Sequence, residues 1–310
     1  MGLINNRCSK VLAPWIFVAA PIWAAVPAHP GMLNYAEGQV QINGRVVTNQ
    51  NVGTEDVSVG QTAETEQGKA EFLLTPGVFL RLGEHTRIQM DSTGLTDTRV
   101  TVLNGKTFVE ADNLQRQNNI EVAVRGSVAR LEKNGMYQFE ADPPRVAVLD
   151  GKVEVTEDGR RVSLGKGQDV DLGAELKKAK FDRKSDESDP LYQWSAVRSE
   201  YLAEADLNQA QRFAYGSAGW YGSGWYWDPW FSMYAWVPGD GIFYSPFGWG
   251  FYSPFTVWAA PVYVYGYHGF HGYPGGHVPV VGQHGFRAAP RVSGGFAHGG
   301  FAHGSVGGRR

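Results

Sequence analysis

The stretch VAVLDGKVEV at residues 146–155 nearly copies the stretch VTVLNGKTFVE at residues 100–110. Each copy follows an arginine and places an Asx-Gly pair between two runs in which every second residue is Val or Thr. Successive side chains of a β-strand point to opposite faces, so each run has one face for a core and one for solvent. The repetition therefore predicts one structural solution that is used twice within an all-β domain.

Asx-Gly pairs recur through residues 33–172 and predict tight turns between strands. They are Asn43-Gly44, Asn104-Gly105, Asn134-Gly135, Asp150-Gly151 and Asp158-Gly159. A type I′ turn needs positive φ at both central positions, which Asn or Asp followed by Gly tolerates best. We therefore expect two-residue hairpins, except at Asn134-Gly135, where a longer loop fits the alternation better. A further turn is expected at Thr75-Pro76-Gly77, because Pro fixes φ and Gly accepts the left-handed position.

The hairpin interpretation gives a definite register. About Asp150-Gly151, Val148 would oppose Val153, and Val146 would oppose Val155. The corresponding face of the first copy consists of Val100, Val102, Thr107 and Val109. The competing interpretation is that each Gly marks a corner, where the strand bends into the next turn of a coil. The predicted fold is accordingly all-β, an antiparallel sandwich or roll, with a short β-solenoid as the alternative.

The first 28 residues have the pattern of a secretory signal peptide. Arg7 and Lys10 precede an apolar run, and Val26-Pro27-Ala28 offers a small-residue cleavage site. The run is short and contains two prolines, which favours export over a retained membrane anchor. Cys8 would be removed with the peptide, so the exported chain would have neither a disulfide nor a thiolate metal site. We expect the protein in the periplasm or the outer cell envelope.

Two segments follow the β region, a charged linker at residues 173–188 and an amphipathic helix at residues 189–214. Asp189 and Pro190 provide an N-cap and a first helical position. The apolar residues at helical spacing are Leu191, Trp194, Val197, Tyr201, Leu202 and Ala205. We expect this stripe to pack against the β domain.

Residues 215–310 form a Gly/Trp/Tyr/His-rich tail, which we expect to be largely irregular and of low complexity. No Asp, Glu, Lys or Arg occurs from Gly241 to Phe286, and repeated prolines prevent a continuous helix. Trp and Tyr rings combine a large apolar area with a polar edge, which suits protein interfaces, membrane headgroup levels and sugar faces. The candidate contact residues are Trp220, Trp225, Trp227, Trp230, Trp236 and Trp249. The alternative is that these rings fold back onto the β domain or self-associate.

Several stretches of the β region resemble the FecR-like periplasmic domain. They are Gly38-x-Val40, VSVGQ, GKAEFLL followed by PGVFLRLGEHTRIQM, VTVLNGK, IEVAVRGSVARL, VAVLDGKVEV and VSLGKGQDV. The resemblance covers about residues 50–170 and implies a fold rather than a reaction. With its helix and aromatic tail, the chain looks like exported FecR-domain proteins of Acidobacteria-type bacteria. The transducer that gives the domain its name has, as the resemblance implies, an anti-sigma segment and a membrane helix ahead of this domain. We do not expect them here, because about ten residues precede the apolar run.

No catalytic, cofactor-binding or metal site is expected. The sequence lacks G-x-S-x-G, H-E-x-x-H and phosphate-loop motifs. Six of the eight histidines fall in the tail, and we interpret them as polar members of a Gly/aromatic repeat. Asp91 and Asp97 lack the regular oxygen spacing of a calcium loop. A net charge of −3 gives no electrostatic basis for binding nucleic acid.

These observations predict a non-enzymatic, exported cell-envelope protein. The FecR-like domain would be a protein-interaction or structural module. The aromatic tail would attach it to an envelope protein or a cell-surface polymer, contact a membrane peripherally, or mediate self-association. Two alternatives stay open: a periplasmic regulatory sensor that acts through a separate membrane or anti-sigma partner, and a carbohydrate-binding module.

Overall fold

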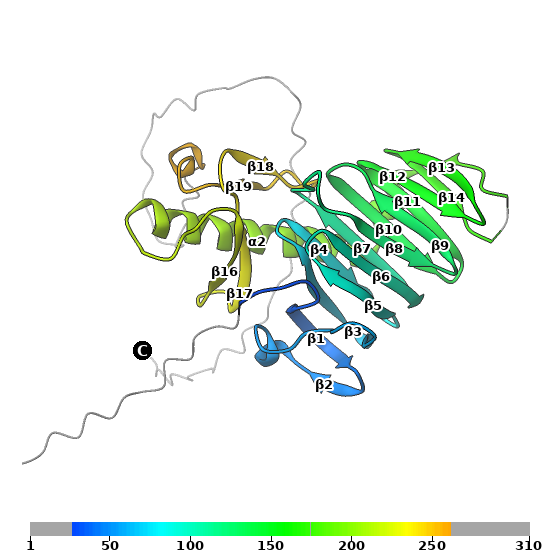
Figure 1. Ribbon diagram of the computed structural model, residues 1–310, viewed down its shortest axis with the longest axis horizontal. Coiled ribbons are helices and arrows are strands. Elements are labelled where there is room, and N and C mark those ends of the chain that lie inside the picture. Colours follow the sequence, from blue (N-terminus) through cyan, green and yellow to red (C-terminus); the bar gives the residue numbers. More distant parts are fainter. Residues whose placement is uncertain (1–26, 174, 262–310) are drawn as a thin grey trace, which may run out of the picture.

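A computed structural model describes residues 27–173 and 175–261 (Figure 1). The predicted signal peptide, apart from its last two residues, lies outside the described residues. So do the six tail histidines, from His268 to His303.

Residues 33–180 form one large curled sheet. Its strands are β1 (Leu33–Ile42), β2 (Arg45–Val47), β3 (Thr62–Thr75), β4 (Val78–Leu82), β5 (Arg87–Gly94), β6 (Asp97–Asn104), β7 (Lys106–Ala111), β8 (Ile120–Val124), β9 (Ser127–Leu131), β10 (Gly135–Ala141), β11 (Pro144–Asp150), β12 (Lys152–Glu157), β13 (Arg160–Gly165), β14 (Gln168–Asp171) and β15 (Ala179–Lys180). The order is β13-β12-β9-β8-β6-β5-β3-β4-β7-β10-β11-β14-β15, and β1 pairs with β2 and β3. β6 and β8 run parallel, so the sheet is mixed. The prediction of an all-β fold is confirmed.

The long strand β3 allows the sheet to curl. Its first residues pair with β5, and residues 70–75 pair with β4. The two halves of the sheet therefore face each other, and β10 lies close to β6 and β8 without pairing with them. Figure 1 shows this curled, half-barrel arrangement. The space between the halves is filled by apolar side chains, among them Leu33, Val40, Ile42, Phe72, Leu80, Ile88, Val100, Val109, Val122, Val146, Val148, Val153 and Val155.

The repeated stretches turn corners and do not form hairpins. β11 pairs with β10 and β14, whereas β12 pairs with β9 and β13, so the predicted oppositions of Val148 to Val153 and Val146 to Val155 are wrong. The hairpin predicted at Asn104-Gly105 is also wrong, because β6 and β7 pair with different neighbours. At Asn134-Gly135, where we expect a longer loop, β9 and β10 also pair with different neighbours. At such a corner the chain passes from one half of the sheet to the other, and the Val face of both strands stays turned towards the core. The prediction of that face is therefore confirmed, although the pairing was not.

Two other Asx-Gly pairs do form the predicted hairpins. Ile42 pairs with Arg45 across Asn43-Gly44, and Glu157 pairs with Arg160 across Asp158-Gly159. All four turn residues have positive φ, between 48° and 77°, as a type I′ turn requires. The predicted turn at Pro76-Gly77 is also present, with φ of 83° at Gly77.

The region predicted as a charged linker contains the short strand β15 and the short helix α1 (Arg183–Glu187). Helix α2 (Pro190–Ala214) follows, and the Asp189 side chain caps it by accepting a 2.7 Å hydrogen bond from the Leu191 amide. The predicted helix and its cap are therefore confirmed.

The aromatic segment that follows α2 is folded as far as residue 261. It contains the hairpin of β16 (Gly224–Asp228) with β17 (Met233–Val237), the hairpin of β18 (Ile242–Tyr244) with β19 (Gly250–Tyr252), and the 3-10 turn η2 (Val257–Ala259). Its side chains share a core with the sheet and with α2, formed by Met32, Leu73, Phe79, Leu202, Ala203, Ala205, Met233, Tyr234, Ala235, Trp236 and Phe251. The prediction of a largely irregular tail is therefore wrong for this segment, because its aromatic rings take the place of the scarce aliphatic residues in the shared core.

Among the described helices, none combines the length and the apolar character that crossing a membrane requires.

Candidate functional site: the two faces of helix α2

The inner face of α2 is polar and is held by buried charges. The Arg198 Nη2 atom donates a 2.9 Å hydrogen bond to Glu71 Oε1, and its guanidinium lies 4.1 Å from the centre of the Tyr35 ring. Glu71 also accepts hydrogen bonds from Asn34 and from Arg81 Nε, at 3.0 and 2.9 Å. Because Glu71 and Arg81 are fully buried, α2 is joined to the sheet by an ion pair that water does not screen.

A second carboxylate completes this network. Glu110 forms an ion pair with Arg81 Nη1 and accepts a 2.6 Å hydrogen bond from the Ser199 hydroxyl. Burial alone would raise the pKa of Glu71, but Arg198 and Arg81 outweigh it and hold the pKa below its ordinary value. Burial and the neighbouring Glu110 raise the pKa of Asp112 well above its ordinary value. The carboxylates of Glu71 and Glu110 balance the guanidinium groups of Arg81 and Arg198, which is what allows charge to be buried here.

Two further buried carboxylates attach the aromatic hairpins to α2. Asp228, next to the β16–β17 turn, accepts hydrogen bonds from Asn208 and Gln209 of α2, both at 2.9 Å. Asp206 of α2 accepts a 2.6 Å hydrogen bond from the Tyr252 amide in β19. The helix therefore fixes both hairpins relative to the sheet.

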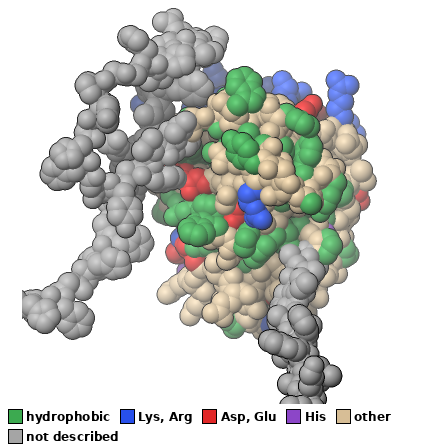
Figure 2. All heavy atoms as spheres, turned by 90° about the vertical axis from the view of Figure 1, so that its left-hand side faces the viewer, with side chains coloured by type: hydrophobic (Ala, Val, Ile, Leu, Met, Phe, Trp, Pro, Cys, Tyr) green, Lys and Arg blue, Asp and Glu red, His purple; other side chains and the backbone are tan. Residues whose placement is uncertain are grey.

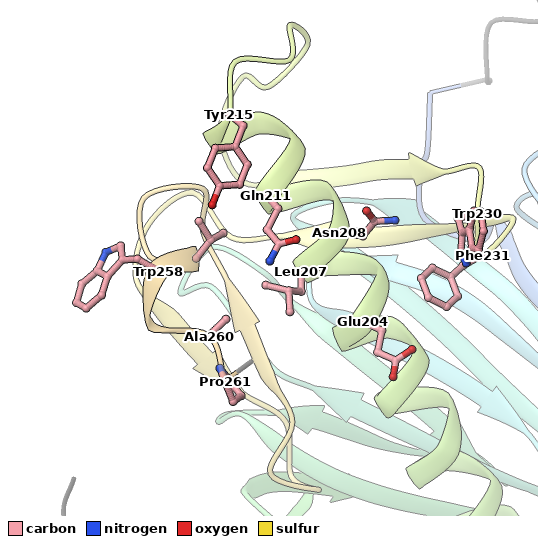
Figure 3. Close-up of a pocket in the computed structure, with 11 residues that line it drawn as sticks. Glu204, Leu207, Asn208, Gln211, Tyr215, Trp230, Phe231, Trp258, Ala260 and Pro261 are labelled. Atoms are coloured by element: carbon pink, nitrogen blue, oxygen red, sulfur yellow. The ribbon is translucent and has the colours of Figure 1, made fainter. Parts of the chain in front are cut away.

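The outer face of α2 is the floor of an open groove of about 670 Å³ (Figure 3). The turn between β16 and β17 borders the groove on one side, and η2 with the residues after it borders the other. Residues that line the groove include Glu204, Leu207, Tyr215, Trp230, Phe231 and Trp258. Figure 2 shows hydrophobic side chains spread over this side of the molecule, with acidic and basic side chains between them.

Three aromatic side chains around this groove are almost fully exposed. The exposed fractions are 85% for Tyr215, 84% for Trp230 and 83% for Trp258. A single exposed ring is ordinary on a protein surface, but several exposed rings around one groove are typical of a contact site. The groove is therefore the strongest candidate for a contact surface in the described residues.

The six tryptophans singled out from the sequence fall into different environments. Trp236 is fully buried, which leaves it no surface with which to contact a partner. Trp225, Trp227 and Trp249 are partly buried against the shared core, and Trp220 packs edge-on against Phe255. Trp230 alone of the six is exposed and lines the groove. Of the six, it is therefore the residue that we retain as a candidate contact residue.

The sequence-based account of α2 missed its orientation. Leu191, Leu202 and Ala205 are buried as expected, but Val197 and Tyr201 are 43% and 45% exposed. The buried polar residues of the helix are Ser195, Arg198, Ser199, Asp206 and Gln209. Arg198 and Ser199 face inward because the sheet presents Glu71 and Glu110 to them. Asp206 and Gln209 bond instead to the aromatic hairpins. No periodicity of apolar residues could reveal these polar partners.

The sequence also gave no signal for Tyr215, Trp258 and Glu204. They are ordinary members of an aromatic-rich or helical stretch until the fold places them around one groove. A search could have found them only by combining two features. These are a helix with Glu at four-residue spacing on its solvent face, and aromatic residues on both sides of that helix.

The polar residues considered for chemistry in the β domain have structural partners. Asp91 accepts a hydrogen bond from Thr101 and Asp97 one from Ser92, both within the β5–β6 hairpin. Asp169 forms an ion pair with Arg145 at 2.8 Å. In residues 27–173 and 175–261, no three His, Cys, Asp or Glu side chains are grouped as a metal site would require.

Two crystal structures of candidate anti-sigma factors from Parabacteroides distasonis are similar to this chain. The first has a TM-score of 0.35 and 15% identity, covering 49% of this chain and 73% of that one. The second has a TM-score of 0.33 and 17% identity, covering 46% and 64%. Likenesses this slight carry no argument of their own.

The comparison with curated proteins found no match. The family model described as FecR protein matches residues 61–154. That span runs from the start of β3 into β12 and includes both copies of the repeated stretch. Residues 61–154 of this chain are therefore a FecR domain.

Proposed function

We propose that this chain is a non-enzymatic regulatory protein of the cell envelope, in which a FecR domain holds helix α2 and its aromatic hairpins as a protein-binding surface. The FecR match supports the regulatory part of the proposal. The signal-peptide pattern at residues 1–28 supports export to the periplasm or the outer envelope.

The observation that carries the proposal is the set of exposed rings around the groove. Tyr215, Trp230 and Trp258 sit at the rim of a surface that the buried Arg198–Glu71 pair and the Asp228 cluster fix in place. A rigid surface with exposed aromatic residues loses little conformational entropy on binding and desolvates a large area, which is the property of interface hot spots.

Photocrosslinking of the full-length protein in its native envelope tests this proposal. A photoreactive amino acid replaces Trp258 in one variant and Leu95, which is 50% exposed in the β5–β6 turn, in the control. We expect one discrete protein adduct from position 258, none from position 95, and loss of the adduct when Trp230→Ala is added. Equal labelling from both positions, or an adduct indifferent to Trp230→Ala, would contradict a specific surface.

A carbohydrate ligand is the second candidate, because Trp230 and Trp258 present exposed ring faces of the kind that stack on sugars. Sedimentation with purified cell-wall polysaccharide separates the two. Co-sedimentation that is lost in the Trp230→Ala, Trp258→Ala double variant would favour the carbohydrate.

A further inference from the structure

The groove on α2 carries negative charge that the protein itself does not neutralise. Glu204 lines the groove, and Glu200 lies one helical turn before it. Within the described residues, neither the Glu200 nor the Glu204 carboxylate forms an ion pair. Like charges four residues apart on a helix repel each other, so this pair costs the free protein stability.

The surroundings of these carboxylates increase that cost. Both side chains are half-buried, and burial raises the pKa of Glu200 and of Glu204. The charge of Glu200 raises the pKa of Glu204 further. The basic residue in the last turn of α2, Arg212, does not line the groove.

Aromatic rings line the same groove as Glu204. They belong to Tyr215, Trp230, Phe231 and Trp258 (Figure 3), and the faces of aromatic rings attract cations. A groove that presents both a carboxylate and aromatic faces can accept a segment that carries guanidinium or ammonium groups. The protein already contains one such arrangement, where Arg198 pairs with Glu71 and lies over the Tyr35 ring.

We propose that the groove on the outer face of α2 binds a basic segment of a partner protein, whose Arg or Lys side chains pair with Glu204 and contact the aromatic rings that line the groove. This inference rests on the proposed function and specifies the chemistry of the partner. Charge complementarity selects this occupant over an apolar or acidic segment, because a cation relieves the repulsion between Glu200 and Glu204 and an anion would increase it.

The test uses the full-length protein and a fluorescently labelled peptide, acetyl-Val-Arg-Val-Arg-Val-amide. Its control peptide has citrulline in place of both arginines, which keeps the shape and removes the charge. Fluorescence anisotropy gives the affinities of the wild type, of Glu204→Gln and of Glu175→Gln. Glu175 is an exposed carboxylate of the linker, so its substitution changes the net charge equally without touching the groove.

We expect Glu204→Gln to weaken binding of the arginine peptide by about fivefold or more, and Trp258→Leu to weaken it similarly. Glu175→Gln should bind as the wild type does, and the citrulline peptide should bind weakly to every variant. Equal affinity for the two peptides, or equal effects of the two Glu→Gln changes, would overturn the inference.

Two other occupants are separated in the same series. If removing the terminal charges with Arg309→Ser and Arg310→Ser tightened peptide binding, the chain's own terminus would fill the groove, which overturns a partner segment. A dimer that Glu204→Gln dissociates in analytical ultracentrifugation would assign the groove to a second copy, which also overturns a partner segment.

The inference can fail while the proposed function holds. A Trp258 adduct that persists in Glu204→Gln, with no arginine-dependent peptide binding, would overturn this inference and leave the proposed function standing.

Discussion

Arg198 and Glu71 are 127 residues apart in the chain and meet in a 2.9 Å ion pair with almost no contact with solvent. A buried pair of this kind contributes little net stability compared with apolar residues of the same shape. Removing one partner is costly, however, because the other charge stays buried and uncompensated. Arg198 therefore acts as a determinant of where α2 lies.

Arg198→Met should lower the free energy of unfolding by about 3–5 kcal/mol, since Glu71 keeps its charge and loses one of its two guanidinium partners. The double variant Arg198→Met, Glu71→Gln should recover part of that loss, because it removes the orphaned charge and leaves Arg81 paired with Glu110. Chemical denaturation measures both.

The matched control is Arg45→Met, which breaks a 2.8 Å ion pair with Glu55 at a site where Arg45 is 69% exposed. It should cost about 0–1 kcal/mol. A double variant as unstable as Arg198→Met alone would show that the loss comes from packing and not from the charge.

Asp206 makes the stability of the α2–β19 contact depend on pH. Burial raises its pKa well above the ordinary value, and the hydrogen bond from the Tyr252 amide opposes this less strongly. The folded protein thus holds this proton to higher pH than the unfolded chain. The contribution is fully present below the pKa of the unfolded chain, about 4, and is lost as pH rises towards the folded pKa.

Asp206→Asn should accordingly gain stability relative to the wild type as pH increases from about 4 to about 8. The measurement is the difference between the melting temperatures of the two proteins at each pH. Other groups whose titration changes stability, such as Glu71, are present in both proteins, so their effects cancel in this difference. A difference that stays constant over this range would mean that Asp206 does not titrate in the folded protein as described.

At the scale of the element, the corners between the two halves of the sheet distinguish this fold from a simple series of hairpins. Gly105, at a corner, and Gly44, in a hairpin, have the same φ of 77°. A Cβ on Gly105 would lie 2.5 Å from the His85 carbonyl oxygen and 2.6 Å from the Thr86 Cα, whereas a Cβ on Gly44 would meet nothing within 4 Å.

Both Gly→Ala variants incur the cost of a left-handed residue, about 1–2 kcal/mol. Gly105→Ala should lose clearly more stability than Gly44→Ala in urea denaturation, because the backbone around His85 must also move. Equal losses at the two positions would show that the corner is not closely packed.

The features that the sequence predicted correctly depend on residues that are close together in the chain. The Val faces at 146–155 and the Asp189 cap depend on neighbours along the chain, and both were predicted correctly. A hairpin and a corner need the same Asx-Gly pair and bury the same valines, so the choice between them depends on strands far away in the sequence. For the same reason, the apolar stripe predicted for α2 wrongly included Val197 and Tyr201.

At the scale of the whole molecule, the FecR domain, α2 and the aromatic hairpins share one core. Trp236 belongs to this core, as do Phe79 of β4 and Leu202 of α2. The Trp236 ring packs on the rings of Phe243 and Phe251. Of the contact residues predicted from composition, Trp225, Trp227, Trp236 and Trp249 belong to or pack on this core, Trp220 packs on Phe255, and Trp230 lines the groove. Composition could not separate them, because an aromatic ring that fills a core and one that binds a partner look alike in sequence.

This shared core is what makes the groove a rigid surface, and rigidity is the central claim of the account. Amide hydrogen exchange of the full-length protein tests it most directly, by comparing residues 233–237 of β17 with residues 107–111 of β7. We predict that both sets exchange only through the same global opening, with equal protection and equal dependence on denaturant. If residues 233–237 exchanged by a local opening far faster than residues 107–111, the hairpins would be a loosely attached tail, and the groove would not exist as a fixed surface.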